Sequence, residues 1–255
     1  PLIFYDGDFF LEHLLYGPLS DKSMAFFPGL SWIIKLFLPL NSSKGKIMLS
    51  VLLINITCGL ITITFLNKIF SAINQNSTKF KNLVSLMFAL SPLQVYFIGF
   101  YTESIFLLIQ TIGLYYLVLK TQKQELTILH SLIASSIFLI GGFIRSNGML
   151  SAGFPIFFYL ATVNISYFYF FKLVFLTIVS GCLLISPFII VQLYSSMLLC
   201  SNQFNQDSFC NKILPFSYGM LQKKYWNVEF LTFTGDRRPI NLIFILPITL
   251  IFLTA

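Results

Sequence analysis

The amino-acid sequence predicts an all-helical protein that crosses a membrane several times. Of its 255 residues, 56% are hydrophobic and only 10% are charged, whereas soluble domains carry about 25% charged residues. The hydrophobic residues form long uncharged runs, and a helix needs about 20 such residues to cross a bilayer. These runs do not alternate polar and apolar residues as the strands of a membrane barrel do. We therefore expect about seven or eight transmembrane helices.

Eight apolar runs, taken in chain order, account for the seven or eight expected helices. The first, Met24 to Leu40, is interrupted by Pro28, Gly29 and Lys35, so we expect a shorter or tilted crossing there. The other candidate spans are Ile47 to Leu66, Leu83 to Thr102, Ser104 to Leu119, Leu126 to Ile144, Ser146 to Phe171, Leu173 to Gln206 and Pro239 to Ala255. The last run stops while it is still apolar and the first residue is not Met. We therefore expect both ends to be truncated.

The charge balance fits a membrane protein better than a nucleic-acid-binding protein. The formal net charge of +7 comes from 16 Lys and Arg against nine acids. The basic residues stand singly or in pairs between apolar runs, where they orient helices and meet anionic lipid head groups. The sequence therefore predicts membrane lipids as partners and no nucleic acid.

The four cysteines fall into two classes. Cys58 and Cys182 lie inside apolar runs, where a free thiol behaves as a small hydrophobic group. Cys200 and Cys210 flank the polar segment SNQFNQDSF, and they would close a disulfide if this loop faces an oxidising compartment. The alternative is two unpaired thiols near a membrane surface.

The densest group of acids lies in the first polar segment. Asp6, Asp8, Glu12 and Asp21 fall within sixteen residues of a chain that has only nine acids. Asp6 and Asp8 are two positions apart, so on a helix they point to nearly opposite sides and only one faces a pocket squarely. The segment predicts a catalytic carboxylate, and the alternative is a solvated loop whose carboxylates cap helices.

Three later segments place polar residues where apolar runs meet. Glu103, in SPLQVYFIGFYTES, is either a turn residue or a group that faces a polar cavity. Arg145 and Asn147 stand among glycines that allow close backbone approach. The guanidinium fork of arginine suits a phosphate, although a loop arginine also snorkels to lipid head groups. Asn227, in LPFSYGMLQKKYWNVEFLTF, is a pocket residue or part of an aromatic interfacial helix.

These motifs occur in the same order in a known family. The segments AFFPG (25–29), FYTES (100–104), RSNG with its trailing AGF (145–154) and SYGMLQKKYWNVEFL (217–231) resemble the PIG-V family, GPI mannosyltransferase 2. The resemblance covers nearly the whole chain and implies a single GT-C glycosyltransferase domain over residues 1–255, in the endoplasmic reticulum membrane. It places loops of approximately residues 1–25 and 200–240 in the lumen.

The resemblance also implies a reaction. Members of the family transfer the second mannose, in α1,6 linkage, from dolichyl-phosphate mannose to the growing GPI lipid. Their aromatic-Asp pair corresponds to Tyr5–Asp6, although a Trp is more usual, and this assigns the catalytic base to Asp6. One carboxylate suffices because a phosphate leaves without protonation, unlike the alkoxide in glycoside hydrolysis. We therefore expect no metal and no other cofactor.

Substrate binding is assigned to a wider set. Arg145 is expected to stabilise charge on the departing phosphate. The partners expected are dolichyl-phosphate mannose, the GPI-precursor glycolipid and an accessory membrane subunit. The alternatives are another GT-C enzyme with a different lipid or protein acceptor, or a polytopic transporter with polar residues in mid-helix. The candidate substrate-binding residues are Asp8, Glu103, Arg145, Asn147, Trp226 and Asn227.

Overall fold

The computed structural model describes residues 7–17, 20–38, 42–73, 78–91, 99–162, 167–201, 210 and 217–227. Every regular element in these ranges is a helix. The α-helices are α1 (Gly7–Leu15), α2 (Gly29–Phe37), α3 (Lys44–Ile73), α4 (Thr78–Ala89), α6 (Glu103–Gln122), α7 (Ile128–Ile144), α8 (Gly153–Thr162), α9 (Tyr167–Ser201) and α10 (Ser217–Trp226). Two 3-10 helices, η1 (Ser23–Ala25) and η2 (Ser146–Ala152), complete them.

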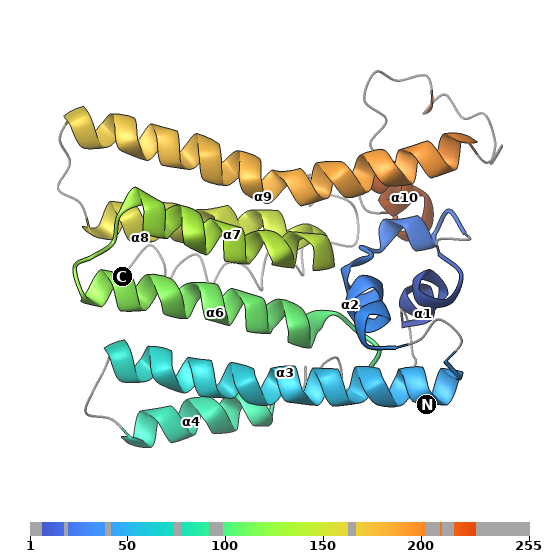
Figure 1. Ribbon diagram of the computed structural model, residues 1–255, viewed down its shortest axis with the longest axis horizontal. Coiled ribbons are helices and arrows are strands. Elements are labelled where there is room, and N and C mark those ends of the chain that lie inside the picture. The colour runs from blue at the N-terminus through green and yellow to red at the C-terminus, as the bar shows by residue number, and fades with distance from the viewer. Residues whose placement is uncertain are drawn as a thin grey trace.

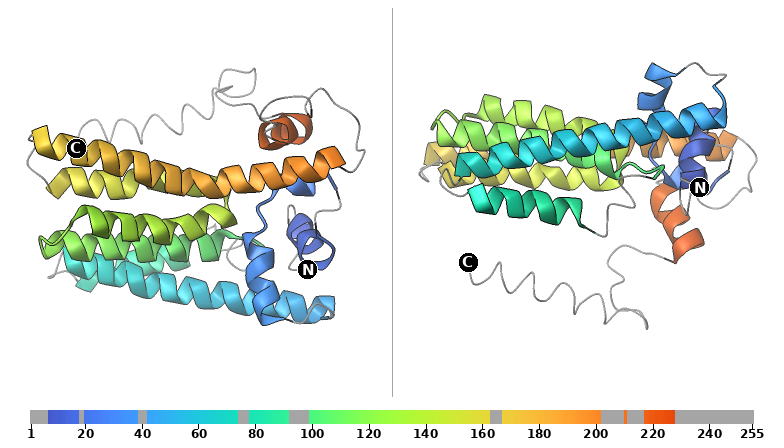
Figure 2. Two further views of the ribbon diagram at one scale, coloured as in Figure 1. Left: turned by 45° about the horizontal axis from the view of Figure 1, so that its top comes forward. Right: turned by 90° about the horizontal axis from the view of Figure 1, so that it is seen from below.

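The long helices form a bundle in which α6 lies between α3 and α7, and α7 packs against α9 (Figure 1). The shorter α4 packs on α3, and α8 contacts α6, α7 and α9. The short helices α1, α2 and α10 gather at one end of this bundle, as both views of Figure 2 also show. Polar segments that are far apart in the sequence therefore meet at one end of the molecule.

The structure confirms the predicted class, an all-helical membrane protein. Within the described residues, three helices are long and apolar enough to cross a membrane: Lys44–Ile73, Glu103–Gln122 and Phe170–Ser201. The apolar helix α7 is shorter, with 17 residues. The number of seven or eight crossings stays a prediction, and the candidate span Pro239 to Ala255 lies outside the described residues.

Three predicted spans are shorter as helices than as apolar runs. The run Met24 to Leu40 contains the nine-residue helix α2, which begins directly after Pro28, a residue that lacks the backbone N–H of a regular helix interior. The helix α4 ends at Ala89, within the run Leu83 to Thr102. The run from Ser146 to Phe171 is divided between η2, the ten-residue α8 and the start of α9.

Buried hydrogen bonds hold the polar end of the bundle in place. The Asn55 amide of α3 donates to the carbonyl of Gly99 over 2.7 Å. The Ser151 hydroxyl of η2 donates to the side-chain oxygen of Gln110 on α6 over 2.8 Å. In apolar surroundings such side-chain bonds join helices. They fix residues 99–101 and η2 relative to the long helices.

Glycines allow the tightest contact, at the end of α7. A Cβ atom added to Gly148 would lie 2.5 Å from the Gly142 Cα atom, and one added to Gly29 would lie 2.6 Å from the Phe143 carbonyl oxygen. Real Cβ atoms do not approach backbone this closely. Because these positions lack side chains, η2 and the start of α2 both rest directly against the end of α7.

We predict that Gly148→Ala destabilises the full-length protein, because the new methyl group meets backbone that has no room to move. Overpacking of this kind costs about 1–3 kcal/mol, and thermal unfolding in detergent should report it as a lower midpoint. The matched control is Gly153→Ala, whose added Cβ atom meets nothing within 4 Å. Equal midpoints for the two variants would contradict the packing described here.

Candidate functional site

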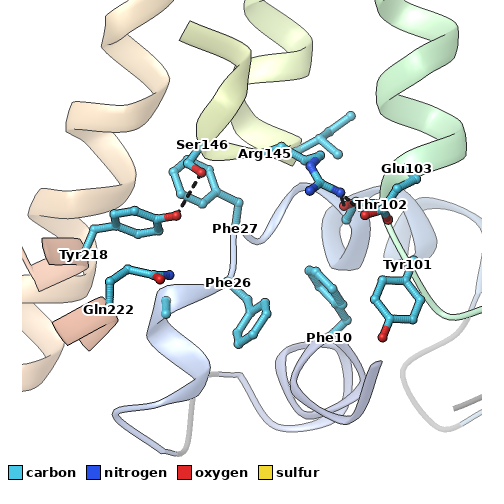
Figure 3. Close-up of a pocket in the computed structure, with 12 residues that line it drawn as sticks. Phe10, Phe26, Phe27, Tyr101, Thr102, Glu103, Arg145, Ser146, Tyr218 and Gln222 are labelled. Atoms are coloured by element: carbon cyan, nitrogen blue, oxygen red, sulfur yellow. Dashed lines mark hydrogen bonds and ion pairs between the residues drawn. The ribbon is translucent and has the colours of Figure 1, made fainter. Parts of the chain in front are cut away.

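A pocket of about 140 Å³ opens at the end of the bundle where the short helices gather. It is lined by Phe10 of α1, by residues 25–27, 101–103 and 144–146, and by Tyr218 and Gln222 of α10. Figure 3 shows the α10 side chains on one side of the pocket and Glu103 with Arg145 on the other. Aromatic walls with a few convergent polar groups are typical of ligand sites.

An ion pair between Arg145 and Glu103 forms the charged side of the pocket. Glu103 is the first residue of α6, where the helix dipole favours a carboxylate. Arg145 follows the last residue of α7, and its extended backbone (φ −145°, ψ 143°) ends that helix. The Arg145 Nη1 atom contacts Glu103 Oε1 and also donates to the Thr102 hydroxyl over 3.3 Å (Figure 3).

Both charged side chains remain accessible from the pocket. The exposed fraction is 32% for the Arg145 side chain and 27% for the Glu103 side chain, so a ligand can reach each of them. The second Glu103 oxygen, Oε2, is buried and has no hydrogen-bond partner among the described residues. Among the residues that the structure describes, only the Nη1 atom of the guanidinium is engaged, so donors on the other nitrogens remain unused.

The opposite side of the pocket is built by α10. Its start is held by Gln192, buried in α9, whose side-chain oxygen accepts from the backbone N–H of Tyr218 over 2.6 Å and from the Ser217 hydroxyl over 3.1 Å. The Tyr218 hydroxyl in turn lies 3.1 Å from the Ser146 hydroxyl, directly after Arg145. These bonds connect α9, α10 and the end of α7 around one cavity.

The segment between α1 and α2 is clamped onto α10 from outside the pocket. Asp21 accepts a hydrogen bond from Lys224 over 2.8 Å. The Lys22 ammonium lies 4.9 Å from the ring centroid of Phe9 and 5.5 Å from that of Trp226. Burial raises the pKa of Asp21, but hydrogen bonds from Lys224 and Tyr225 outweigh burial, and the net pKa is lowered. This attraction holds at neutral pH and is lost as the pH falls through the lowered pKa.

Of the candidate residues, the structure brings Glu103 and Arg145 together in the pocket and places four others elsewhere. Asp8 is exposed in the first turn of α1, and Asn147 is exposed in η2. Trp226 packs edge-on against Phe26, with ring centroids 5.8 Å apart. These residues and Asn227, exposed after α10, do not line the pocket. The catalytic candidate Asp6 lies outside the described residues.

The sequence as a whole matches the family model described as Mannosyltransferase (PIG-V) over residues 1–255. The chain belongs to the PIG-V mannosyltransferase family. GPI mannosyltransferase 2 of Yarrowia lipolytica is 28% identical over 247 residues, which cover 97% of this chain and 64% of the relative. The protein of the same name from Candida albicans is 26% identical, with 97% and 62% covered.

A mammalian relative matches over a similar range. GPI alpha-1,6-mannosyltransferase 2 of Cricetulus griseus is 23% identical over 98% of this chain and 56% of the relative. The chain thus spans about three fifths of the length of these curated members of the PIG-V family. No solved structure matches the chain.

The pocket of this PIG-V chain contains residues that sequence reasoning did not single out. Tyr218 and Gln222 are four positions apart in the SYGMLQKK segment, a spacing that places two side chains on one face of a helix. This spacing predicts that both side chains face the same surface. Nothing local distinguished Ser146 or Tyr101 from the other hydroxyl-bearing residues around them, because their role depends on how distant segments meet.

A disulfide ties the end of α9 to the chain that leads to α10. Cys200 and Cys210 are joined, with an S–S distance of 2.05 Å and Cα atoms 5.8 Å apart. Cys210 packs against a cluster that contains Met24, Leu199 and Leu221. The bond therefore lies beside the contact that holds the short helices together. Cys58 and Cys182 are free thiols.

We predict that Cys200 and Cys210 resist alkylation in the full-length PIG-V protein until a reductant is added. Mass spectrometry of natively folded microsomal protein, labelled with a thiol reagent before and after reduction, measures this. In a parallel sample that is denatured without reductant, Cys182, a free thiol of α9, serves as the reference for an unpaired thiol. Labelling of both Cys200 and Cys210 without reduction would show that they are not paired.

Proposed function

We propose that this chain forms the catalytic core of a GT-C mannosyltransferase that adds the second mannose, in α1,6 linkage, to the GPI-anchor precursor. The donor is dolichyl-phosphate mannose, and the enzyme works in the endoplasmic reticulum membrane with α1, α2 and α10 at the lumenal end. Support comes from membership of the PIG-V family and from relatives named GPI mannosyltransferase 2. The observation that carries the proposal is the Arg145–Glu103 pair, set in a pocket at one end of a membrane bundle.

In this proposal Arg145 holds the donor phosphate. A guanidinium carries five N–H donors in a planar fork. Its Nη1 atom contacts Glu103 and Thr102, so the N–H groups on the other nitrogens remain for phosphate oxygens. Glu103 orients the fork through its contact with Nη1. The positive charge stabilises the negative charge that develops on the departing phosphate.

The acceptor occupies the α10 side. An acceptor hydroxyl attacks the anomeric carbon of the donor mannose while the bond from that carbon to the phosphate oxygen breaks. Attack from the face opposite the phosphate inverts the configuration from β to α. The Tyr218 hydroxyl and the Gln222 amide, which line this side of the pocket, supply hydrogen bonds to the glycan. The aromatic rings of Phe10 and Phe26 close the apolar side.

We assign the general base to Asp6. The proton of the attacking hydroxyl passes to this carboxylate, and the phosphate leaves without being protonated, so the step requires no second acid and no metal. In support, the following helix α1 contributes Phe10 to the pocket. Its first residue, Gly7, is buried and three positions from Phe10, so both lie on the same face of α1.

We predict that Asp6→Asn in the full-length protein lowers mannosyl transfer by about 10²–10⁴-fold, the usual contribution of general base catalysis. The amide keeps the size and most hydrogen bonds of the carboxylate but not its basicity, so expression should be unchanged. Transfer is measured with defined GPI intermediates and dolichyl-phosphate mannose. The control is Asp8→Asn, because Asp8 is exposed and does not line the pocket.

The assignment of the base fails if Asp6→Asn supports transfer at the normal rate while Asp8→Asn does not. Loss of activity in both variants with normal expression would leave two carboxylates in the reaction, contrary to a single-base mechanism. The assay with defined acceptors also separates this function from a GT-C enzyme that uses another acceptor.

A further inference from the structure

A second cavity, of about 310 Å³, lies beside the segment that separates α1 from α2. Phe27 lines the candidate active site, and the next residue, Pro28, lines this second cavity. The remaining walls come from the end of α1, from α2 and from the C-terminal half of α9. The two cavities share no lining residue, so the second cavity is a separate site.

The walls of the second cavity are mainly apolar, with one permanent cation. Trp32, Ile190 and Val191 supply apolar surface, and Lys35 stands in the last turn of α2. The other basic group, His13, is buried and contacts the Ser23 carbonyl oxygen over 2.7 Å. Burial lowers the pKa of His13, so the imidazole is neutral at neutral pH. Among the described residues, no carboxylate lines this cavity.

The surface around the cavity has the composition of a membrane interface. Trp32 and Tyr194 at its rim are 48% and 49% exposed, respectively. Beside them α2 exposes Leu36 and Phe37, and α9 exposes Met197. Trp and Tyr gather at the level of lipid head groups, and the lysine stem lies on apolar surface while its ammonium reaches polar groups. A lipid of the bilayer can therefore enter the cavity from the side.

We propose that this cavity binds one anionic glycerophospholipid of the surrounding bilayer, with its phosphate at Lys35 and an acyl chain between α2 and α9. The single ammonium without a lining carboxylate complements one negative charge, and the apolar walls complement a hydrocarbon chain. A bilayer lipid fits better than either substrate lipid, because the donor phosphate is placed at Arg145 and the acceptor glycolipid at α10, both in the other cavity. That last step rests on the proposed function.

The test uses native mass spectrometry of the full-length protein, extracted from vesicles that contain phosphatidylcholine with a minor share of phosphatidylglycerol. The wild-type protein should retain one phosphatidylglycerol through delipidation. Lys35→Gln should lower this retention several-fold and leave phosphatidylcholine unchanged. Ile190→Trp, which fills the cavity from a half-exposed position, should also lose the lipid. The matched control is Lys46→Gln, because Lys46 is an exposed cation in the first turn of α3.

Size-exclusion profiles and unfolding midpoints identify any variant that fails to fold. Retention of phosphatidylglycerol by Lys35→Gln at the wild-type level would overturn the proposal. So would equal retention of both lipids by the wild-type protein. So would replacement of phosphatidylglycerol by added polyprenyl phosphate, or by added phosphatidylinositol, which is the lipid part of the acceptor. Because lipid retention is measured without catalysis, these results do not depend on the mannosyltransferase assay.

Discussion

The ion pair between Arg145 and Glu103 is the interaction on which the rest of the site depends. It joins the end of α7 to the start of α6, so both helix ends are positioned by one contact. A charge that stands next to a long apolar run is costly unless it has a partner. Removing one member of this half-buried pair leaves the charge of the other without compensation. The pair explains why two charged residues are retained between long apolar runs.

The packing around this pair is organised to bring polar helix ends to one place. Gly148 lies against Gly142, so η2 turns back at once and carries Ser146 to the Tyr218 hydroxyl. Asn55 holds the backbone that precedes Glu103. The long helices are mainly apolar, with a few buried and hydrogen-bonded polar side chains such as Asn55 and Gln110. The charged groups that line the pocket, Glu103 and Arg145, stand at helix ends. Under the proposed function, a site at the end of the bundle would give the sugars and lipid chains of the substrates access to the same residues.

Hydropathy predicted the fold class because the cost of burying charge in hydrocarbon is large and depends little on details. It predicted helix ends less well. The interruption of the run over 24–40 at Pro28 was predicted from the sequence. The run over 146–171, however, turns back at Gly148 without any change in composition, so the predicted single span is divided between η2, α8 and the start of α9.

The same limit applies to the site. Glu103 and Arg145 were each identified from the sequence, but their pairing across 42 positions depends on how α6 and α7 pack. Asn147 follows the pocket residue Ser146, but its own side chain is exposed. Trp226 packs on the outside of the pocket residue Phe26 and does not line the pocket. Neighbouring positions in a motif share a sequence signal, and only the backbone decides which of them faces the cavity.

A double-mutant cycle on transfer at limiting donor tests the central claim most directly. The variants are Arg145→Gln, Glu103→Gln and the double variant, all in the full-length enzyme with unfolding midpoints as the control for folding. If Glu103 acts by orienting Arg145, the single Glu103 variant loses part of the activity. The double variant should then be no slower than Arg145→Gln alone. Losses that multiply in the double variant would show two independent roles and contradict the account.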